Sequence, residues 1–161
     1  IEVRTMNNLF AWLKSIFNKP AVYLQYRRFG IFRELSSFEL YLLHNLVHSR
    51  SFKTGEMLFE KDYPMEVIYF IEKGEIQLSP AVDTSITHKV GKNQILGLWD
   101  MFGAGKRNST ASAITDVSAL AITRSDFWVY IHDRPKTGIK VLKAISEEIV
   151  KDALTLYTMD R

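Results

Sequence analysis

Residue types that could bind an anion gather between Gly97 and Thr110. Arg107 is followed directly by polar residues, Asn108, Ser109 and Thr110, and Gly97 lies ten residues before it. An arginine side chain offers a planar fork of N–H donors and a charge that does not titrate near neutral pH. A lone arginine is nevertheless most often a surface residue. Whether Arg107 binds an anion therefore depends on the secondary-structure elements that position its side chain.

Two other patterns could in principle do chemistry, and both are weaker. His44 and His48 are four residues apart, a spacing that can hold a metal ion on a helix, but no third ligand accompanies them. Gly103 and Gly105 flank Ala104 without the Lys-Ser/Thr ending of a phosphate-binding loop. There is no cysteine, no Gly-x-Ser-x-Gly and no clear carboxylate pair. We therefore expect a binding module rather than an enzyme, with no metal and no cofactor.

The composition is that of a globular chain. It has 161 residues, 47% hydrophobic and 24% charged, enough for one domain with a sizeable core. There is no run of about 18 apolar residues and no basic-then-apolar secretory signal. We therefore expect a cytoplasmic protein. The chain does not begin with Met, which is compatible with a fragment of a longer protein.

The net charge of +3 is concentrated at the start of the chain. Residues 1–35 hold six basic and two acidic residues, a net +4 that leaves −1 for the rest. Apolar and aromatic side chains recur there at helical spacing, namely Leu9, Phe10, Trp12, Leu13, Ile16 and Phe17. Beside Lys14 and Lys19 they could contact a membrane surface. The interpretation we favour is a helix that packs on the rest of the domain.

The periodicity divides the chain into three zones. A helical zone ends near Val47 and includes a capping box, with Ser36 as N-cap and Glu39 three residues later. From Arg50 to Ile122 the period is two, which predicts a sandwich or barrel of short strands. The runs are Met57–Glu60, Val67–Glu72, Glu75–Ser79, Ile86–Val90, Ser109–Ile114 and Val117–Ile122.

The helical period returns from Arg124. Ser125 or Thr123 can cap a helix that ends near His132, and Pro135 opens the last helix. An apolar stripe follows that last helix, made of Ile139, Leu142, Ile145, Ile149, Ala153 and Leu156. A stripe of this length can pack on the β zone or pair with its copy in a homodimer.

The order and spacing of the motifs in the β zone resemble the cyclic nucleotide-binding domain family. They are found at residues 52–56, 67–76, 90–97 and 106–113. The resemblance implies a mainly β fold, a jelly-roll-like β-barrel (a double-stranded β-helix) with N-terminal helices and two C-terminal helices. We expect an N-terminal helical extension at 1–35 and the domain proper at 36–158. Within it the barrel would cover about 50–123 and the C-terminal helices about 124–158.

In this family a short cassette holds the ligand. It reads roughly Phe-Gly-Glu-Leu-Ala-Leu and then Pro-Arg-Ala-Ala-Thr, which matches residues 96–101 and 106–110 here. The resemblance implies that Arg107 holds a cyclic phosphate with the N–H groups of a short helix at 98–102, and that Gly97 lets the backbone approach the ligand. The candidate ligand-binding residues are Gly97, Leu98, Trp99, Arg107, Asn108 and Ser109.

The cassette departs from the family pattern at Leu98. The family normally has a glutamate there, which accepts a hydrogen bond from the ribose 2′-hydroxyl, and leucine cannot do so. Asp100 is two residues away, but on a helix it would point to a different face. Trp99 replaces a smaller aliphatic residue and could narrow the pocket. The anion half of the site is retained, while the ribose half has lost one partner.

Two functions from different classes fit these observations. The first is a regulatory sensor that binds cyclic AMP, cyclic GMP or a similar small anion and shifts its C-terminal helices. The alternative is a degenerate domain that binds no ligand and serves as a dimerisation or interaction scaffold, with a homodimer formed through the last helix. Crp-type regulators of the family add a helix-turn-helix after that helix, and we expect no DNA-binding element in this chain.

Overall fold

The computed structural model describes residues 2–18, 22–80 and 87–159, and the side chains of 6–14, 22–80 and 87–155. The chain divides into two compact units. The β unit covers residues 47–129, and the helical unit combines residues 1–46 with 130–161. The candidate ligand residues all fall in the β unit.

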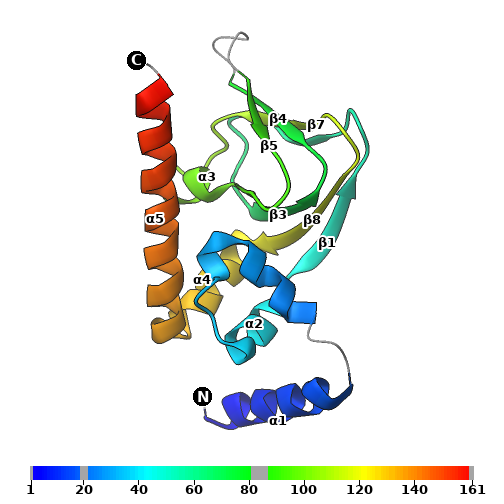
Figure 1. Ribbon diagram of the computed structural model, residues 1–161, viewed down its shortest axis with the longest axis vertical. Coiled ribbons are helices and arrows are strands. Elements are labelled where there is room, and N and C mark those ends of the chain that lie inside the picture. The colour runs from blue at the N-terminus through cyan, green and yellow to red at the C-terminus, as the bar shows by residue number, and fades with distance from the viewer. Residues whose placement is uncertain (1, 19–21, 81–86, 160–161) are drawn as a thin grey trace. The chain divides into compact units, whose positions relative to one another are not determined.

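Two antiparallel sheets build the β unit (Figure 1). One has the strand order β1-β8-β3-β6 and the other the order β2-β7-β4-β5. The strands of the first are β1 (His48–Phe52), β8 (Val117–Thr123), β3 (Val67–Lys73) and β6 (Ile95–Leu96). Those of the second are β2 (Met57–Phe59), β7 (Thr110–Ala113), β4 (Ile76–Ser79) and β5 (His88–Val90). Neighbouring strands distant in sequence are typical of a jelly roll, so the fold prediction is confirmed.

The core of the β unit lies between the two sheets. Tyr69 and Ile71 on β3 pack in one cluster with Ile76 on β4 and with alanines of β7 and β8. Side chains two apart on a strand share a face, which places 69 and 71 inward together. The small residues, Ala111, Ala113, Ala119 and Ala121, leave room for the large ones opposite.

The predicted runs of period two match strands β2, β3, β4, β5, β7 and β8 to within one or two residues. β5 begins at His88, and the start of its predicted run at Ile86 lies outside the described residues. The structure adds β1, whose register pairs His48 with Ala121 and Phe52 with Val117. It also adds the two-residue strand β6, which pairs with Tyr69 and Phe70 of β3.

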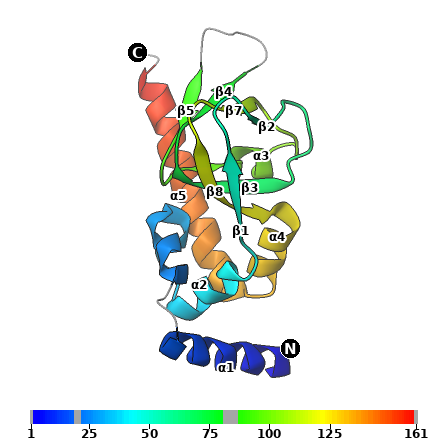
Figure 2. The ribbon, with the colours of Figure 1, turned by 90° about the vertical axis from the view of Figure 1, so that its right-hand side faces the viewer.

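The helical elements are α1 (Glu2–Asn18), η1 (Val22–Arg28), η2 (Gly30–Phe32), α2 (Ser37–His44), α4 (Arg124–His132) and α5 (Pro135–Met159). α5 is the long orange-to-red helix of Figures 1 and 2. It begins at Pro135 as predicted. Thr123 caps α4, because its Oγ1 accepts a hydrogen bond from the Asp126 backbone N–H at 3.0 Å.

The predicted capping box of α2 is present and does more than cap. The Glu39 carboxylate accepts from the Ser36 backbone N–H at 2.7 Å, and Ser36 accepts from the Glu39 N–H. The same carboxylate accepts from Thr137 Oγ1 at 2.7 Å and from Lys140 Nζ at 3.0 Å, both on α5. Tyr130 of α4 donates its hydroxyl to the Glu39 carbonyl. Glu39 thus joins three helices of the helical unit.

The apolar stripe predicted on α5 is buried over only part of its length. Ile145 and Val141 are buried, whereas Ile139 is 69% exposed. Leu142, Val150 and Leu154 are exposed with Ile139, and the side chain of Leu156 lies outside the described residues. The predicted residues do share one side of the helix, but they are covered unequally: at 100° per residue, the buried Ile145 lies about 120° around the helix from the exposed Ile139. We call the four exposed residues, Ile139, Leu142, Val150 and Leu154, the outer face of α5.

The N-terminal helix α1 exposes Leu9, Phe10 and Leu13, while Trp12 packs edge-on against Phe38 of α2, with ring centroids 5.5 Å apart. The side chains of Ile16 and Phe17 lie outside the described residues. No helix in the described ranges is both long and apolar enough to cross a bilayer.

The histidine pair of the sequence does not share a helix. α2 ends at His44, and His48 begins strand β1. His44 Nδ1 is 2.8 Å from the Tyr26 hydroxyl, and burial lowers the pKa of its imidazole. The helical spacing of the two histidines was misleading, because the chain changes from helix to strand between them.

Candidate anion site

The predicted short helix of the cassette is present as α3 (Leu98–Phe102). Its N-cap is Gly97, whose backbone has a φ of 107°, in the left-handed region that glycine tolerates best. The Met101 N–H donates to the Gly97 carbonyl at 3.0 Å and closes the first turn. Gly103 ends the helix, with its N–H donated to the Trp99 carbonyl.

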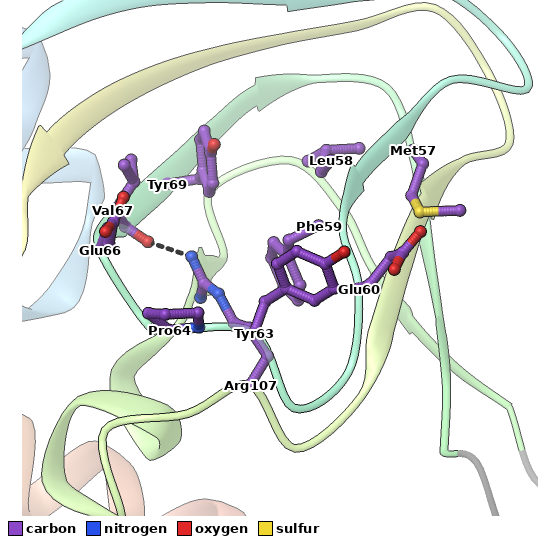
Figure 3. A pocket seen from close by; sticks show the side chains of 10 residues that line it. All are labelled: Met57, Leu58, Phe59, Glu60, Tyr63, Pro64, Glu66, Val67, Tyr69 and Arg107. Atoms are coloured by element: carbon purple, nitrogen blue, oxygen red, sulfur yellow. Dashed lines mark hydrogen bonds between the residues drawn. The ribbon is translucent and has the colours of Figure 1, made fainter.

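Arg107 folds back into the β unit instead of extending into solvent. Its residue exposure is 3%. Nη2 donates to the Val67 carbonyl at 2.6 Å, and Nη1 lies 3.2 Å from Asp100 Oδ2 (Figure 3 shows the Val67 bond). The guanidinium stacks over the Phe59 ring at 3.7 Å from its centroid. Burial lowers the pKa of Arg107, and the neighbouring Asp100 carboxylate opposes that shift.

The backbone of Arg107 is fixed to the loop before β3. Its N–H donates to the Tyr63 carbonyl at 2.8 Å, and its carbonyl accepts from the Asp62 N–H at 2.9 Å. Two residues earlier, the Gly105 carbonyl accepts from the Met65 N–H at 2.9 Å. These bonds hold the cassette against that loop, so the direction in which the Arg107 side chain leaves the backbone is set locally.

Gly97 makes room for Arg107 itself. A Cβ at this position would lie 2.9 Å from Arg107 Nη1, 3.2 Å from Met65 Cε and 3.4 Å from the Val67 carbonyl oxygen. The resemblance implied that this glycine lets the backbone approach a ligand. The structure gives it an additional reason, which is space for the inward guanidinium.

Asp100 faces the cassette arginine. Besides the contact with Arg107, its Oδ1 accepts from the Asn108 backbone N–H at 3.1 Å. The residue is buried, and it lies on the third position of α3. The expectation that Asp100 points away from Leu98 is compatible with this placement. The sequence did not indicate that Asp100, on that different face of the helix, would contact Arg107.

A pocket of about 340 Å³ opens beside the guanidinium (Figure 3). Its walls come from β2, from the loop before β3 and from β3 itself. Arg107 lines it together with Met57, Leu58, Phe59, Glu60, Tyr63, Pro64, Glu66, Val67 and Tyr69. Burial raises the pKa of the Tyr69 hydroxyl, and the positive charge of Arg107 works against this rise. The phenol therefore stays a neutral hydrogen-bond donor at physiological pH.

The structure places the six candidate residues differently. Arg107 lines the pocket. Gly97 and Leu98 are buried, Leu98 at 5% exposure, and neither is among the residues that line the pocket. Trp99 is 47% exposed on α3, so its ring points outward and does not fill buried space. Asn108 is exposed and contributes its backbone N–H to Asp100, and Ser109 is half-buried.

Four residues that hold or surround Arg107 were not among the candidates. They are Phe59, Val67, Tyr69 and Asp100. Alternation gave a partial signal, because 67, 69 and 71 share a face of β3 in any strand that covers them. Nothing in the local pattern indicated that Phe59 or Asp100 would meet the arginine.

The donor set of this site suits an anion better than a metal. Three groups of Arg107 can donate, and its Nε is buried without a hydrogen-bond partner. Within the described part of the chain, no group of three His, Cys, Asp or Glu side chains is placed to hold a metal ion. A ligand that brings acceptor oxygens into the pocket would complete the hydrogen bonding of the guanidinium.

Comparison with known proteins shows which family the chain is similar to. The family model described as "Cyclic nucleotide-binding domain" matches residues 49–134. The chain is 24% identical over 125 residues to a "CRP-like cAMP-activated global transcriptional regulator" of Mycobacterium tuberculosis, which covers 76% of this chain and 56% of the relative. The chain thus spans about half the length of the curated relatives it matches.

Solved structures share the fold at low sequence identity. A cyclic nucleotide-binding domain from Methylobacillus flagellatus has a TM-score of 0.74 at 16% identity, covering 85% of this chain and 83% of that one. The N-terminal domain of a transcriptional regulator from Streptomyces coelicolor has 0.66 at 23%, covering 80% and 92%. The regulatory subunit of a cAMP-independent protein kinase A from Trypanosoma brucei has 0.64 at 20%, covering 83% and 50%.

Proposed function

The chain belongs to the cyclic nucleotide-binding domain family, and from this premise we propose that it is a ligand-sensing regulatory domain that holds a small anion at Arg107. The observation that carries the proposal is the buried guanidinium with one unpartnered N–H beside a pocket. Asp100 balances the charge of Arg107 but leaves its Nε–H without an acceptor, and a buried polar group without a partner is costly. A perturbed ionisable group beside a cleft is a candidate for a functional site.

The ligand we propose is a cyclic nucleotide or an anion of similar size. The pocket volume of about 340 Å³ lies at the lower end of the range for small-molecule sites. Aromatic rings of Phe59, Tyr63 and Tyr69 line it and can contact a base or sugar. The M. tuberculosis relative is named as cAMP-activated, which makes cyclic AMP the first ligand to test.

Leu98 sets an upper limit on the affinity. A hydrogen bond to a charged group contributes about 1.5–3 kcal/mol, or roughly ten- to a hundred-fold in affinity. A ligand whose ribose 2′-hydroxyl meets the Leu98 side chain loses that contribution. We therefore expect dissociation constants weaker, by about this factor, than those of a site with glutamate at this position.

The proposed output is a shift of the C-terminal helices 124–158. A ligand moves an equilibrium only by its difference in affinity for the two states. The anion would bind the state in which Arg107 and the N–H groups of residues 97–99 are arranged around it. The helices would then follow as the population of that state grows.

Thermal unfolding tests the proposal directly. With cyclic AMP or cyclic GMP at a hundred times its dissociation constant, the folded state gains about 2.7 kcal/mol, a rise of several degrees in Tm. Arg107→Ala should abolish the rise. Lys106→Ala is the matched control, because it removes the exposed neighbouring cation, and it should leave the rise intact. A full ligand-induced rise in Arg107→Ala would refute the proposal.

A second function is favoured by two specific observations. Leu98 is buried at 5% exposure, and the outer face of α5 leaves four large apolar side chains in solvent. These features fit a domain that has kept the fold, filled the ribose side of its site and dimerises through α5. The T. brucei neighbour is named as cAMP-independent, so membership of this fold does not require cyclic AMP.

Leu98→Glu separates the two functions. A site that lacks only one contact gains affinity for cyclic AMP when the carboxylate is restored. A site whose ribose side is filled loses stability instead, because an unpaired charge is buried there. Calorimetric titration gives the affinity, and urea unfolding of the same sample gives the free energy of unfolding. Leu98→Gln is the uncharged control for the change in shape.

A further inference from the structure

The carboxylate of Asp100 already occupies the donors that an anionic ligand would use. Its Oδ2 lies 3.2 Å from Arg107 Nη1, and its Oδ1 accepts from the Asn108 backbone N–H at 3.1 Å. The pair is enclosed, with side-chain exposures of 3% for Arg107 and 10% for Asp100. One guanidinium N–H and one backbone N–H converge on two oxygens of one negative group. A phosphodiester with two free oxygens would meet the same two donors.

Three observations distinguish this contact from a purely structural ion pair. The guanidinium retains a buried Nε without a partner, so Asp100 does not satisfy it completely. A pocket adjoins the guanidinium, so a second acceptor has space to approach. The carboxylate is carried by a five-residue helix that has a glycine at each end, whereas Arg107 is fixed through its backbone to Tyr63 and Asp62. Asp100 is therefore the less firmly anchored of the two partners, because it stands on a short helix, whereas the Arg107 backbone is hydrogen-bonded to a neighbouring loop.

We propose that Asp100 is a specificity-determining residue that competes internally with the ligand for Arg107, an inference that rests on the proposed anion-binding function. An incoming phosphate must displace the carboxylate from Nη1 and from the Asn108 N–H. The displaced carboxylate remains near the site, because Asp100 is part of α3. It therefore repels a second negative charge on the ligand, as a repulsive element does in selective binding sites.

This repulsion selects the class of ligand. A cyclic nucleotide carries a phosphodiester with one negative charge, whereas a nucleoside 5′-monophosphate carries close to two at neutral pH. With Asp100 present, the charges of Arg107 and Asp100 nearly cancel, and the site accepts the monoanion in preference to the dianion. Removing the carboxylate exposes the full positive charge of Arg107, and the dianion gains more from that change.

Calorimetric titration of the whole chain with cyclic AMP and with 5′-AMP tests the proposal. Asp100→Asn keeps the shape of the side chain and removes the charge. We expect it to bind cyclic AMP about tenfold more tightly than the wild type and to improve 5′-AMP binding by a larger factor. Asp116→Asn, which breaks an exposed pair with Lys53 elsewhere on the β unit, is the matched control and should change neither affinity. Arg107→Ala in the Asp100→Asn background should remove the gain.

Each variant decides a different question. If Asp100→Asn binds both nucleotides as the wild type does, or gains equally for both, the role of Asp100 is overturned. The proposed sensor function can still hold in that case, because it depends on binding of cyclic AMP to the wild type through Arg107. The wild type could also bind neither nucleotide while Asp100→Asn binds through Arg107. That result would support the role of Asp100 and overturn the proposed sensor function. Asp100→Ser provides the same comparison if the Asn variant does not fold. No binding to either Asp100 variant overturns the inference whatever the wild type does.

Discussion

At the scale of single residues, the cassette is organised around the burial of one guanidinium. Removing a charge from water costs several kcal/mol, which the attraction to a partner returns only if the geometry is good. Arg107 meets this cost through Asp100, the Val67 carbonyl and the Phe59 ring. Gly97 leaves space for this guanidinium, since a Cβ at position 97 would lie 2.9 Å from Arg107 Nη1.

Gly97→Ala should therefore destabilise the β unit and weaken anion binding. A left-handed φ costs a non-glycine residue roughly 1–3 kcal/mol, and the new Cβ would also press on Arg107 Nη1 at 2.9 Å. Gly55→Ala is the matched control, because Gly55 has a φ of 89° with nothing within 4 Å of the added Cβ. Urea unfolding should give a larger loss for Gly97→Ala than for Gly55→Ala. Equal losses would show that Arg107 is not confined there.

The sequence predicts the residues of this site in part. The resemblance to the family's cassette was enough to predict a short helix at 98–102 ahead of Arg107, and α3 covers these residues. The pairing of Arg107 with Asp100 could not be predicted from the local sequence pattern, because it depends on the hydrogen bonds by which residues 62–65 hold the cassette backbone. Trp99 shows the same limit: its position in the motif was clear, but its 47% exposure follows from the direction of α3.

At the scale of elements, the carboxylate of Glu39 joins α2 to α5. Burial acts to raise the pKa of Glu39, but hydrogen bonds from Thr137, the Ser36 N–H and Lys140 outweigh it and lower the pKa to about 2. A carboxyl with a lowered pKa stabilises the folded state fully above its unfolded value near 4.5. That stabilisation is lost as the pH falls from about 4.5 towards 2.

Glu39→Gln should consequently lower Tm at pH 6 by a few degrees and have a much smaller effect near pH 2. Glutamine keeps the capping-box position but loses the charge that attracts Lys140. Thermal unfolding followed by circular dichroism between pH 2 and pH 7 measures the two curves. Glu147→Gln is the control, since its exposed pair with Lys143 spans one helical turn and contributes little. A constant gap between wild type and Glu39→Gln across this range would contradict the assigned pKa.

The outer face of α5 is the element that we expect to form a homodimer. Ile139, Leu142, Val150 and Leu154 expose apolar surface along the helix, and pairing with a second copy would bury it. Val150→Glu combined with Leu154→Glu should convert a dimer to a monomer in sedimentation velocity experiments. Lys151→Glu, an exposed neighbour, controls for the added negative charge. A wild type that is monomeric at high micromolar concentration would exclude this use of α5.

Elements with clear periodicity were predictable, and those without it were not. β3 and β8 are apolar runs of seven residues, and both were expected to within one residue. β1 was not among the predicted runs, because its residues are mostly polar and exposed and give no alternation. The partial burial of the α5 stripe was not predicted, because the spacing of apolar residues does not say which part of the helix surface is covered.

At the scale of the whole molecule, α4 is the element that the two units share. Its residues 124–129 belong to the β unit, and residues 130–132 belong to the helical unit. Within the β unit, Phe102 of α3 meets Trp128 of α4 edge-on, with ring centroids 5.9 Å apart. α3 also carries Asp100, the residue that an anion would displace from Arg107. A change at the anion site therefore has a short physical route from α3 to α4.

Hydrogen exchange with and without cyclic AMP tests this route. If the displacement of Asp100 moves α3, the ligand should change the exchange rate of amides in α4 and in the first turns of α5. Phe102→Ala removes the ring contact without touching Arg107 or the pocket walls. We expect it to keep the affinity within about threefold and to lose most of the ligand-dependent change in α4 and α5. Phe10→Ala, an exposed aromatic residue on α1, is the control. A Phe102→Ala variant that retains the full change in α4 and α5 would show that the signal passes by another path, and coupling energy spread over many contacts would then be the better description.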